Sequence, residues 1–180
     1  MRVYLPFLDV IAPITERDRA ARSAIEQRCA DLIARNICPS CHQLATGTVF
    51  PGQQDQTFYQ DDRVSCHLES YLRGIGHTII VARAHYADIA DMPLDLGYHM
   101  LRMSHTIVNV LKTVVGADKV YLVTMCSGHL SHLHWQLIPR RPGEMIGGRV
   151  FASERGVLTN YAGLRDALAA AVQRHLATIA

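Results

Sequence analysis

Three stretches of the chain repeat apolar residues at the spacing of an α-helix. The first predicts a helix from about Glu16 to Arg35, with Thr15 as its N-cap. The second predicts a central helix from Leu94 to Val115, which Gly116 would end in a left-handed conformation. The third predicts a C-terminal helix over residues 160–180. The apolar stripes are Ala21, Ile25, Cys29, Leu32 and Ile33, then Leu96, Met100, Met103, Ile107, Val110, Leu111 and Val114, then Tyr161, Leu164, Leu168, Val172 and Leu176.

Shorter runs between these helices have the pattern of strands. The β-branched run Thr78–Ala82 predicts a buried strand. Val120–Met125 and Leu133–Ile138 are separated by a short turn region, so we expect them to be neighbours in an antiparallel sheet. Thr57–Tyr59 and Val64–Leu68 predict two further strands.

Composition limits the classes of protein to consider. The chain has 180 residues, 49% of them apolar and 19% charged, which predicts one globular domain over residues 1–180. No apolar run reaches the roughly 18 residues that a membrane-spanning helix needs. A net charge of +2, without a stripe of Lys and Arg, gives no reason to expect nucleic-acid binding. Five cysteines without a secretory signal favour reduced thiols in the cytoplasm.

The segment Cys38-Pro39-Ser40-Cys41 is a candidate metal site. Its two-residue gap allows both sulfurs to face one point, as a tetrahedral zinc ion requires. A redox pair and two ordinary thiols are the alternatives. A redox pair usually sits between a strand and a helix, whereas this motif follows a predicted helix and precedes irregular chain. Zinc would need two further ligands, preferably histidines.

The segment from His132 to Ile138 is the second candidate. In a strand, His132, His134 and Gln136 would share one face, and the apolar residues would share the other. A solvated sheet face is the simplest interpretation. Such faces favour Thr, Lys and Glu, however, and imidazoles about 7 Å apart suit metal binding or catalysis. Around the strand Thr78–Ala82, His77 fits a structural role, and His85 is better placed as a ligand.

Together these segments resemble the histidine triad superfamily. Residues 76–85, GHTIIVARAH, are similar to its GHTLVIPKxH strand, and residues 132–140, HLHWQLIPR, are similar to its HxHxHxIPR signature. The resemblance covers about residues 38–140, so residues 1–37 would be a helical extension. It implies an α+β fold with a mainly antiparallel sheet of about five strands packed on the central helix, with helices added at both ends. It also implies a homodimer.

The resemblance also assigns roles to residues by position. Zinc-bearing members hold a structural metal ion with a CxxC pair, the last histidine of the first motif and the first histidine of the second. These positions are Cys38, Cys41, His85 and His132. The middle histidine of the triad attacks phosphorus, which makes His134 the nucleophile. An acidic residue eight positions before the GH histidine contacts ribose hydroxyls, and that position is Glu69.

Two departures from the family pattern change the expected chemistry. Gln136 replaces the third histidine, as in the branch of transferases and dinucleoside polyphosphate phosphorylases. An amide donates a hydrogen bond to phosphate but cannot protonate a leaving group. The segment Ser127–His132 also replaces the usual GQSxxH turn, which leaves Ser127, His129 and Arg140 as candidate phosphate contacts, with His129 also a candidate acid.

We therefore expect a nucleotide hydrolase or nucleotidyl transferase that acts on a dinucleoside polyphosphate or nucleotide conjugate through a nucleotidyl-histidine intermediate. A phosphate-dependent phosphorylase of the same substrates is one alternative. A non-catalytic, zinc-containing nucleotide-binding protein is another, and a reaction on an unusual nucleotide is a third.

Overall fold

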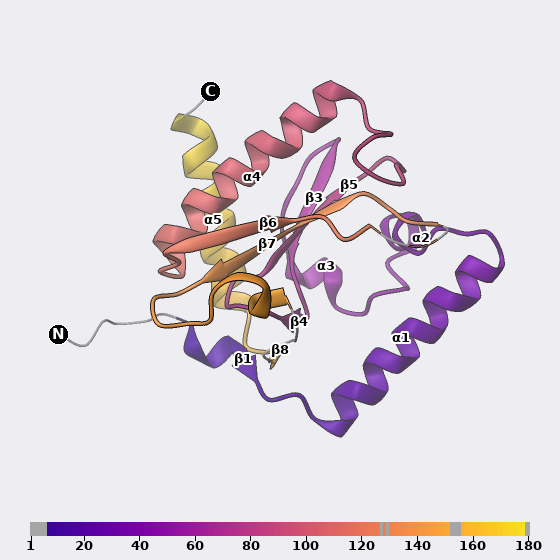
Figure 1. The fold of residues 1–180 in the computed structure, drawn as a ribbon, viewed down its shortest axis with the longest axis horizontal. Coiled ribbons are helices and arrows are strands. Elements are labelled where there is room, and N and C mark those ends of the chain that lie inside the picture. Colours follow the sequence, from indigo (N-terminus) through magenta and orange to yellow (C-terminus); the bar gives the residue numbers. More distant parts are fainter. Residues whose placement is uncertain (1–6, 127, 129, 152–155, 179–180) are drawn as a thin grey trace.

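The computed structural model describes residues 7–126, 128, 130–151 and 156–178. Its main element is a five-stranded sheet of order β2-β3-β5-β7-β6, in which all neighbouring strands are antiparallel (Figure 1). A small antiparallel sheet of order β1-β8-β4 lies beside it. The strands are β1 Ile11–Ala12, β2 Thr57–Gln60, β3 Val64–Leu68, β4 Tyr71–Leu72, β5 Thr78–Ala82, β6 Lys119–Val123, β7 His134–Arg140 and β8 Gly156–Leu158.

Helices pack against the main sheet, so the α+β fold expected from the sequence is confirmed. The helices are η1 Leu8–Val10, α1 Glu16–Ala34, α2 Pro39–Thr46, α3 Gln53–Gln56, α4 Leu94–Val114, η2 Gly147–Phe151 and α5 Ala162–Thr178. The three long helices begin and end within two residues of the predicted bounds. Among the described residues, no helix is long and apolar enough to cross a membrane.

The hydrophobic core lies between the main sheet and α4. Cys66, Ile80 and Trp135 pair across β3, β5 and β7 and point to one face of the sheet, because alternate residues of a strand share a face. The apolar stripe of α4 packs on this face, and α5 packs beside α4. Gly116 ends the helix region with φ +71°, as the sequence predicts. The buried stripe of α4 consists of Leu96, Met100, Met103, Ile107, Val110 and Leu111.

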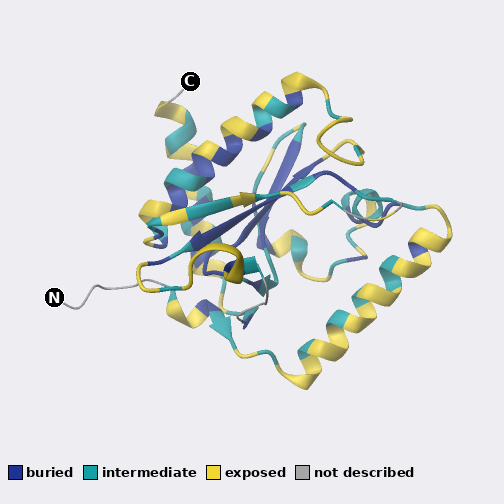
Figure 2. Cartoon of the chain, viewed as in Figure 1, coloured by how far each residue is buried: buried dark blue, intermediate teal, exposed yellow. Residues whose placement is uncertain are grey.

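Helix α1 lies away from this core. It begins with a capping box in which the Thr15 hydroxyl accepts a hydrogen bond from the Asp18 N–H, and the Asp18 carboxylate accepts one from the Thr15 N–H. Most of its residues are exposed or half-buried, and Leu32 is its buried residue (Figure 2). The predicted apolar stripe of α1 is therefore not part of the hydrophobic core.

The region after α1 differs from the prediction. Irregular chain was expected after the cysteine pair, but Pro39–Thr46 forms helix α2, and Gln53–Gln56 forms the short helix α3. Cys38 is the N-cap of α2 and Pro39 is its first residue. Proline is favourable at this position because its missing N–H would have no partner in the first turn of a helix. The sequence alone does not distinguish a proline that begins a helix from one that ends it, and α2 was therefore not predicted.

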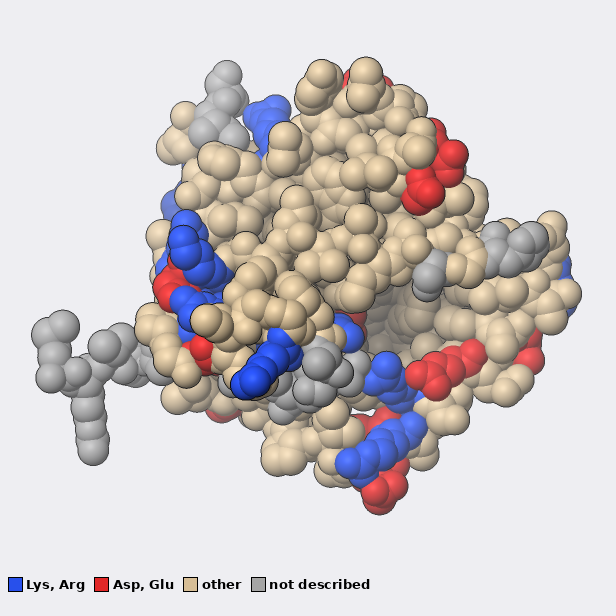
Figure 3. Space-filling view, in the orientation of Figure 1, with Lys and Arg blue, Asp and Glu red and all other residues tan. Residues whose placement is uncertain are grey.

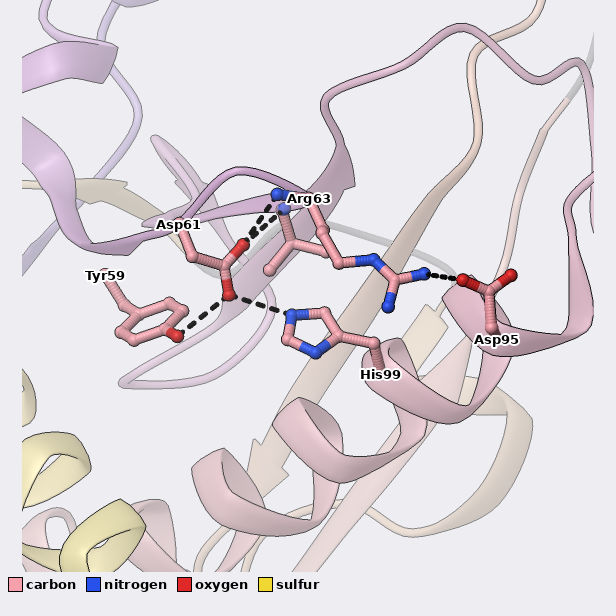
Figure 4. Close-up of polar contacts among 6 residues, drawn as sticks. Tyr59, Asp61, Arg63, Asp95 and His99 are labelled. Carbon is pink, nitrogen blue, oxygen red and sulfur yellow. Dashed lines mark hydrogen bonds and ion pairs between the residues drawn. The ribbon is translucent and has the colours of Figure 1, made fainter. Parts of the chain in front are cut away.

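A polar cluster ties the β2–β3 turn to α4 on the core side of the sheet (Figure 4). One carboxylate oxygen of Asp61 accepts hydrogen bonds from the N–H groups of Arg63 and Val64, at 2.8 Å each. The other accepts from the Tyr59 hydroxyl at 2.9 Å and lies 2.8 Å from Nε2 of His99 on α4. Burial opposes ionisation of Asp61, but these hydrogen bonds outweigh it and lower its pKa.

Replacing Asp61 by Ala is expected to lower the free energy of unfolding by about 2 kcal/mol, since hydrogen bonds to a charged group are lost and buried donors lose their acceptor. Because the folded pKa of Asp61 is depressed, its contribution is complete above the unfolded pKa of about 3.9 and disappears as the pH falls through the folded pKa. Urea unfolding at pH 7 and pH 3 measures both effects. Asp62→Ala, at an exposed neighbour, is the control; an equal loss in both variants at pH 7 would contradict the account.

Candidate active site and metal cluster

The face of the main sheet opposite α4 lines a cavity of about 590 Å³. Two rows of residues paired across β3, β5 and β7 point to this face. Helix α1 and the segment around α3 form the facing wall. Figure 3 shows the cavity as a hollow with charged side chains along one rim. The rows are Ser65, Val81 and His134, then His67, Ile79 and Gln136.

Beside the cavity, the structure brings together the four residues expected to bind metal. The Sγ atoms of Cys38 and Cys41 each lie 3.4 Å from Nδ1 of His132. The Sγ atom of Cys41 also lies 3.4 Å from Nδ1 of His85. The four donor atoms are within 4.8 Å of one another. The N-terminus of α2, the end of β5 and the start of β7 therefore converge on one point.

This donor set fits a tetrahedral metal ion. Metal–sulfur and metal–nitrogen bonds of about 2.3 and 2.0 Å place tetrahedral ligands roughly 3.3–3.8 Å apart, which agrees with the 3.4 Å contacts. Burial, together with the neighbouring Cys38, raises the pKa of Cys41 to about 11. A cation bound between the sulfurs would remove this penalty, because it stabilises both thiolates.

Hydrogen bonds fix the ring of His132 for metal binding. Its Nε2 lies 2.7 Å from the carbonyl oxygen of Ala82, at the end of β5. A carbonyl only accepts, so Nε2 carries the proton and Nδ1 presents its lone pair to the cysteines. Burial lowers the pKa of His132, which favours the neutral imidazole that a metal requires.

His134 is fixed in a similar way, but toward the cavity. Its Nδ1 lies 2.9 Å from the carbonyl oxygen of His132 and therefore carries the proton. Its Nε2 keeps a lone pair and lies 3.5 Å from the amide nitrogen of Gln136. His134 thus presents an unprotonated nitrogen inside the cavity that Gln136 also lines.

A short chain of hydrogen bonds orients Gln136. The backbone N–H of Arg73 donates to Nδ1 of His77 at 3.3 Å, so the other ring nitrogen of His77 carries its proton. That Nε2 lies 3.2 Å from Oε1 of Gln136 and donates to it. The amide of Gln136 is then forced to direct its NH₂ group toward His134. His77 is fully buried, so it takes the structural role that its position at the start of β5 suggested.

Two more polar residues line the cavity: His67 on β3 and Glu69, the residue that follows β3. Glu69 accepts a hydrogen bond from the backbone N–H of Tyr71 at 3.0 Å, and burial raises its pKa. His67 lies 2.8 Å, through Nε2, from the amide nitrogen of Gln53 on α3. Burial lowers the pKa of His67 to about 3, so His67 is neutral at pH 7.

Comparison with known proteins decides the family. A model of the HIT domain matches residues 51–143, just over half of the 180-residue chain. The chain belongs to the HIT family. It is also 30% identical, over 90 residues, to an uncharacterized HIT-like protein of Methanocaldococcus jannaschii, a match that covers 48% of this chain and 69% of the relative.

Solved structures share the fold at low sequence identity. A Zn-bound histidine triad family protein from Mycobacterium smegmatis is 18% identical, with a TM-score of 0.61 over 79% of this chain and 97% of that one. A hypothetical histidine triad nucleotide-binding protein from Sulfolobus tokodaii is 17% identical, with a TM-score of 0.60 over 74% and 91%. A uridylyltransferase is 16% identical, with a TM-score of 0.61 over 89% of this chain and 52% of that one.

Three further residues were selected from the HIT pattern as candidate phosphate contacts: Ser127, His129 and Arg140. Ser127 and His129 lie outside the described residues. Arg140 pairs with Asp118 at the far end of β7, about 20 Å from His134 at about 3.3 Å per residue. The structure therefore does not bring Arg140, a candidate phosphate contact, to the cavity that His134 lines. Arg140 shares the strand face of His134, but the strand carries it past the edge of the cavity.

The sequence did not single out several residues that line the cavity. His67 follows from strand alternation, because it lies two residues before Glu69 on β3. Arg22 and Arg73 carried no such signal, since one lies on a helix outside the family motifs and the other in a predicted connection. Arg22 enters the site because α1 forms the wall of the cavity that faces the sheet.

The hydrogen bonds predict the tautomers of three histidines. Long-range ¹H–¹⁵N spectra at pH 7 are expected to show His134 protonated on Nδ1, and His132 and His77 protonated on Nε2. Single His→Gln variants assign the signals. An Nε2–H tautomer at His134 would contradict the geometry, because its lone pair would then face the backbone carbonyl of His132.

Proposed function

We propose that this HIT protein is a nucleotide hydrolase or nucleotidyl transferase that cleaves a nucleoside phosphate anhydride or conjugate, such as a dinucleoside polyphosphate. One observation carries the proposal. The unprotonated Nε2 of His134 is held in a cavity beside the amide of Gln136, with its proton retained on Nδ1 by the carbonyl of His132. This is the arrangement that a nucleophilic imidazole needs.

In the first step, the lone pair of His134 Nε2 attacks the α-phosphorus. A phosphorus–nitrogen bond forms, and the bond from phosphorus to the leaving oxygen breaks, with the electron pair going to that oxygen. The proton on Nδ1 stays in place, so the carbonyl of His132 stabilises the positive ring. In the second step, an oxygen of water or phosphate attacks phosphorus, and the phosphorus–nitrogen bond breaks with its electron pair returning to Nε2 of His134. When water attacks, its proton is released to solvent.

Gln136 has a binding role in this scheme. Its NH₂ group, oriented by His77, donates a hydrogen bond to a non-bridging phosphate oxygen on which charge increases during attack. It supplies no proton, so the leaving group must depart as an anion. Glu69, on the same wall of the cavity, is the residue we assign to the ribose hydroxyls.

The cavity has the size and lining for a nucleotide. Its volume of about 590 Å³ lies within the range of roughly 300–1,000 Å³ that is common for small-molecule sites. Apolar side chains from α1, β5 and the α2–α3 connection offer flat contacts for a base. They are Ile25, Ile33, Phe50, Ile79 and Val81.

We assign zinc, in a structural role, to the cluster of Cys38, Cys41, His85 and His132. Four protein ligands leave no open position for a substrate. Held between α2 and the start of β7, the ion would fix the segment that carries His134. Thiolate ligands need reduced cysteines, which agrees with a cytoplasmic protein.

We also infer a homodimer. The outer face of α4 exposes Leu94, Tyr98 and Leu101, spaced as one helical stripe. Strand β6 is an edge of the main sheet and exposes Leu122. An apolar helix face and an open strand edge are surfaces that a second copy of the chain can cover.

Phosphate dependence separates a hydrolase from a phosphorylase. With diadenosine tetraphosphate, a phosphorylase releases ADP only when inorganic phosphate is present, whereas a hydrolase turns over equally without it. In either case, His134→Ala is expected to lower kcat by about a thousandfold or more, because the nucleophile is lost. Chromatographic analysis of the nucleotides measures both.

The matched control is His99→Ala, which removes an imidazole on the core side of the sheet and should leave kcat within about twofold. If His134→Ala turns over as fast as the wild type, covalent catalysis is excluded. A wild-type protein that binds nucleotides without turning them over would instead support the non-catalytic binding protein.

The zinc assignment predicts about one equivalent of zinc in the purified protein. Cys38→Ser is expected to lose the metal and to lower the melting temperature by several degrees or more, since a ligand that binds only the folded state stabilises it. Cys126→Ser changes a nearby sulfur outside the cluster, and this variant should keep both the zinc and the melting temperature of the wild type. If the wild-type protein contains no metal and Cys38→Ser has the same melting temperature as the wild type, the assignment is excluded.

A further inference from the structure

The two ends of the α1 wall differ in chemistry. Arg22 and Ile33 line the cavity from opposite ends of a stretch that is about 16 Å long at about 1.5 Å per residue. Near Ile33 the wall is apolar and suits a base. Near Arg22 it is charged and aromatic, with Glu26 one turn further along α1, and Tyr71 and Arg73 on the sheet side. The cavity therefore has a polar end in addition to the site around His134.

The guanidinium of Arg22 is held in place at this end. It stacks on the ring of Tyr71, with its central carbon 5.1 Å from the ring centroid. The Tyr71 hydroxyl donates to the backbone carbonyl of Asp18 at 2.8 Å, which fixes the ring against the first turn of α1. Arg22 also pairs with Glu26 at 3.0 Å, but their side chains are 42% and 65% exposed. An exposed pair of this kind is weak, so an anionic ligand can replace Glu26.

Arg73 connects this end of the cavity to the reacting groups. It follows β4, and its backbone N–H begins the hydrogen-bond chain through His77 to Gln136. The side chain of Arg73 lines the cavity together with Glu69 and His134, and its Nε donates a hydrogen bond to the backbone carbonyl of Phe151 at 3.4 Å.

This polar end depends on parts of the chain outside the HIT match. Residues 51–143 include Tyr71 and Arg73 but not α1, which carries Arg22. They also omit β8, which pairs with Tyr71–Leu72 and holds β4 in the small sheet. The added segments thus complete a feature of the cavity that the matched region lacks alone.

We propose that Arg22 and Arg73, with Tyr71 as a platform, form an anion subsite that binds a phosphate on the leaving group of the substrate. This inference rests on the proposed function and narrows it to substrates whose leaving group ends in phosphate. When the bond to the α-phosphorus breaks, the electron pair passes to an oxygen of that phosphate. Two guanidinium groups stabilise the negative charge, so the missing acid at Gln136 is no obstacle.

The binding test compares two ligands that His134 cannot cleave: AMP and α,β-methylene-ADP, which adds only the second phosphate. Titration calorimetry is expected to show that the wild type prefers the second ligand by tenfold or more. Arg22→Gln and Arg73→Gln should each lose most of this preference, while the affinity for AMP stays within about twofold. Arg19→Gln, on the same helix but outside the cavity, is the matched control and should keep the preference.

Glu26→Gln provides a test in the opposite direction. It removes the carboxylate that competes with the ligand for Arg22, so it should tighten α,β-methylene-ADP by about twofold or more and leave AMP unchanged. A merely structural role of the Arg22–Glu26 pair predicts no such gain. The titrations of the arginine variants and of Glu26→Gln are each run with the adenine and the uracil form of both ligands. Circular dichroism of each variant checks its fold.

Kinetics separates this inference from the proposed function. In Arg22→Gln, kcat/KM for diadenosine tetraphosphate should fall by tenfold or more, whereas the p-nitrophenyl ester of AMP, whose leaving group has no phosphate, should be unaffected. Equal losses on both substrates, or equal wild-type affinity for both ligands, would overturn the subsite even if His134 is the nucleophile. A phosphate preference without any turnover would keep the subsite and overturn the enzyme.

Discussion

The hydrogen bond from Nδ1 of His134 to the carbonyl of His132 connects the two parts of this site. The same residue, His132, turns its ring toward the cysteines and its carbonyl toward the next imidazole along the chain. Any shift of the strand start would move both the metal ligand and the lone pair of His134. The Cys2His2 cluster lies at that start, and the antiparallel pairing of β7 with β5 fixes the strand that follows it.

Because alternate residues of a strand point to opposite faces, one face of the main sheet forms the hydrophobic core and the other lines the cavity. On one face, Cys66, Ile80 and Trp135 join α4 in the core. On the other, the residues between them line the cavity, where polar groups are costly to bury unless they have partners. The structure supplies such partners as a chain of contacts. The Arg73 N–H orients His77, His77 orients Gln136, and the amide of Gln136 faces His134. A buried chain of hydrogen bonds of this kind holds the side chains of the site in one orientation before a substrate binds.

The main helices and the five-stranded sheet could be predicted from periodicity and strand patterns. The convergence of Cys38, Cys41, His85 and His132 could be predicted only from the resemblance to zinc-bearing histidine triad proteins. Helix α2 could not, since Pro39 at a helix start looks like a helix breaker. The position of Arg140 followed the motif, but strand length, which the motif does not encode, carries it to Asp118. Arg22 lines the cavity because α1 lies across it from the sheet, a long-range arrangement without a local signal in the sequence.

The central claim is that Nε2 of His134 forms a covalent bond to phosphorus, and trapping that intermediate tests it most directly. After brief mixing with diadenosine tetraphosphate and rapid quenching under mildly alkaline denaturing conditions, in which phosphoramidates persist, peptide mass spectrometry locates any adduct. The account predicts one nucleoside monophosphate on His134, absent from His134→Ala. Turnover by the wild type with no adduct on any histidine, or an adduct that persists in His134→Ala, would contradict it.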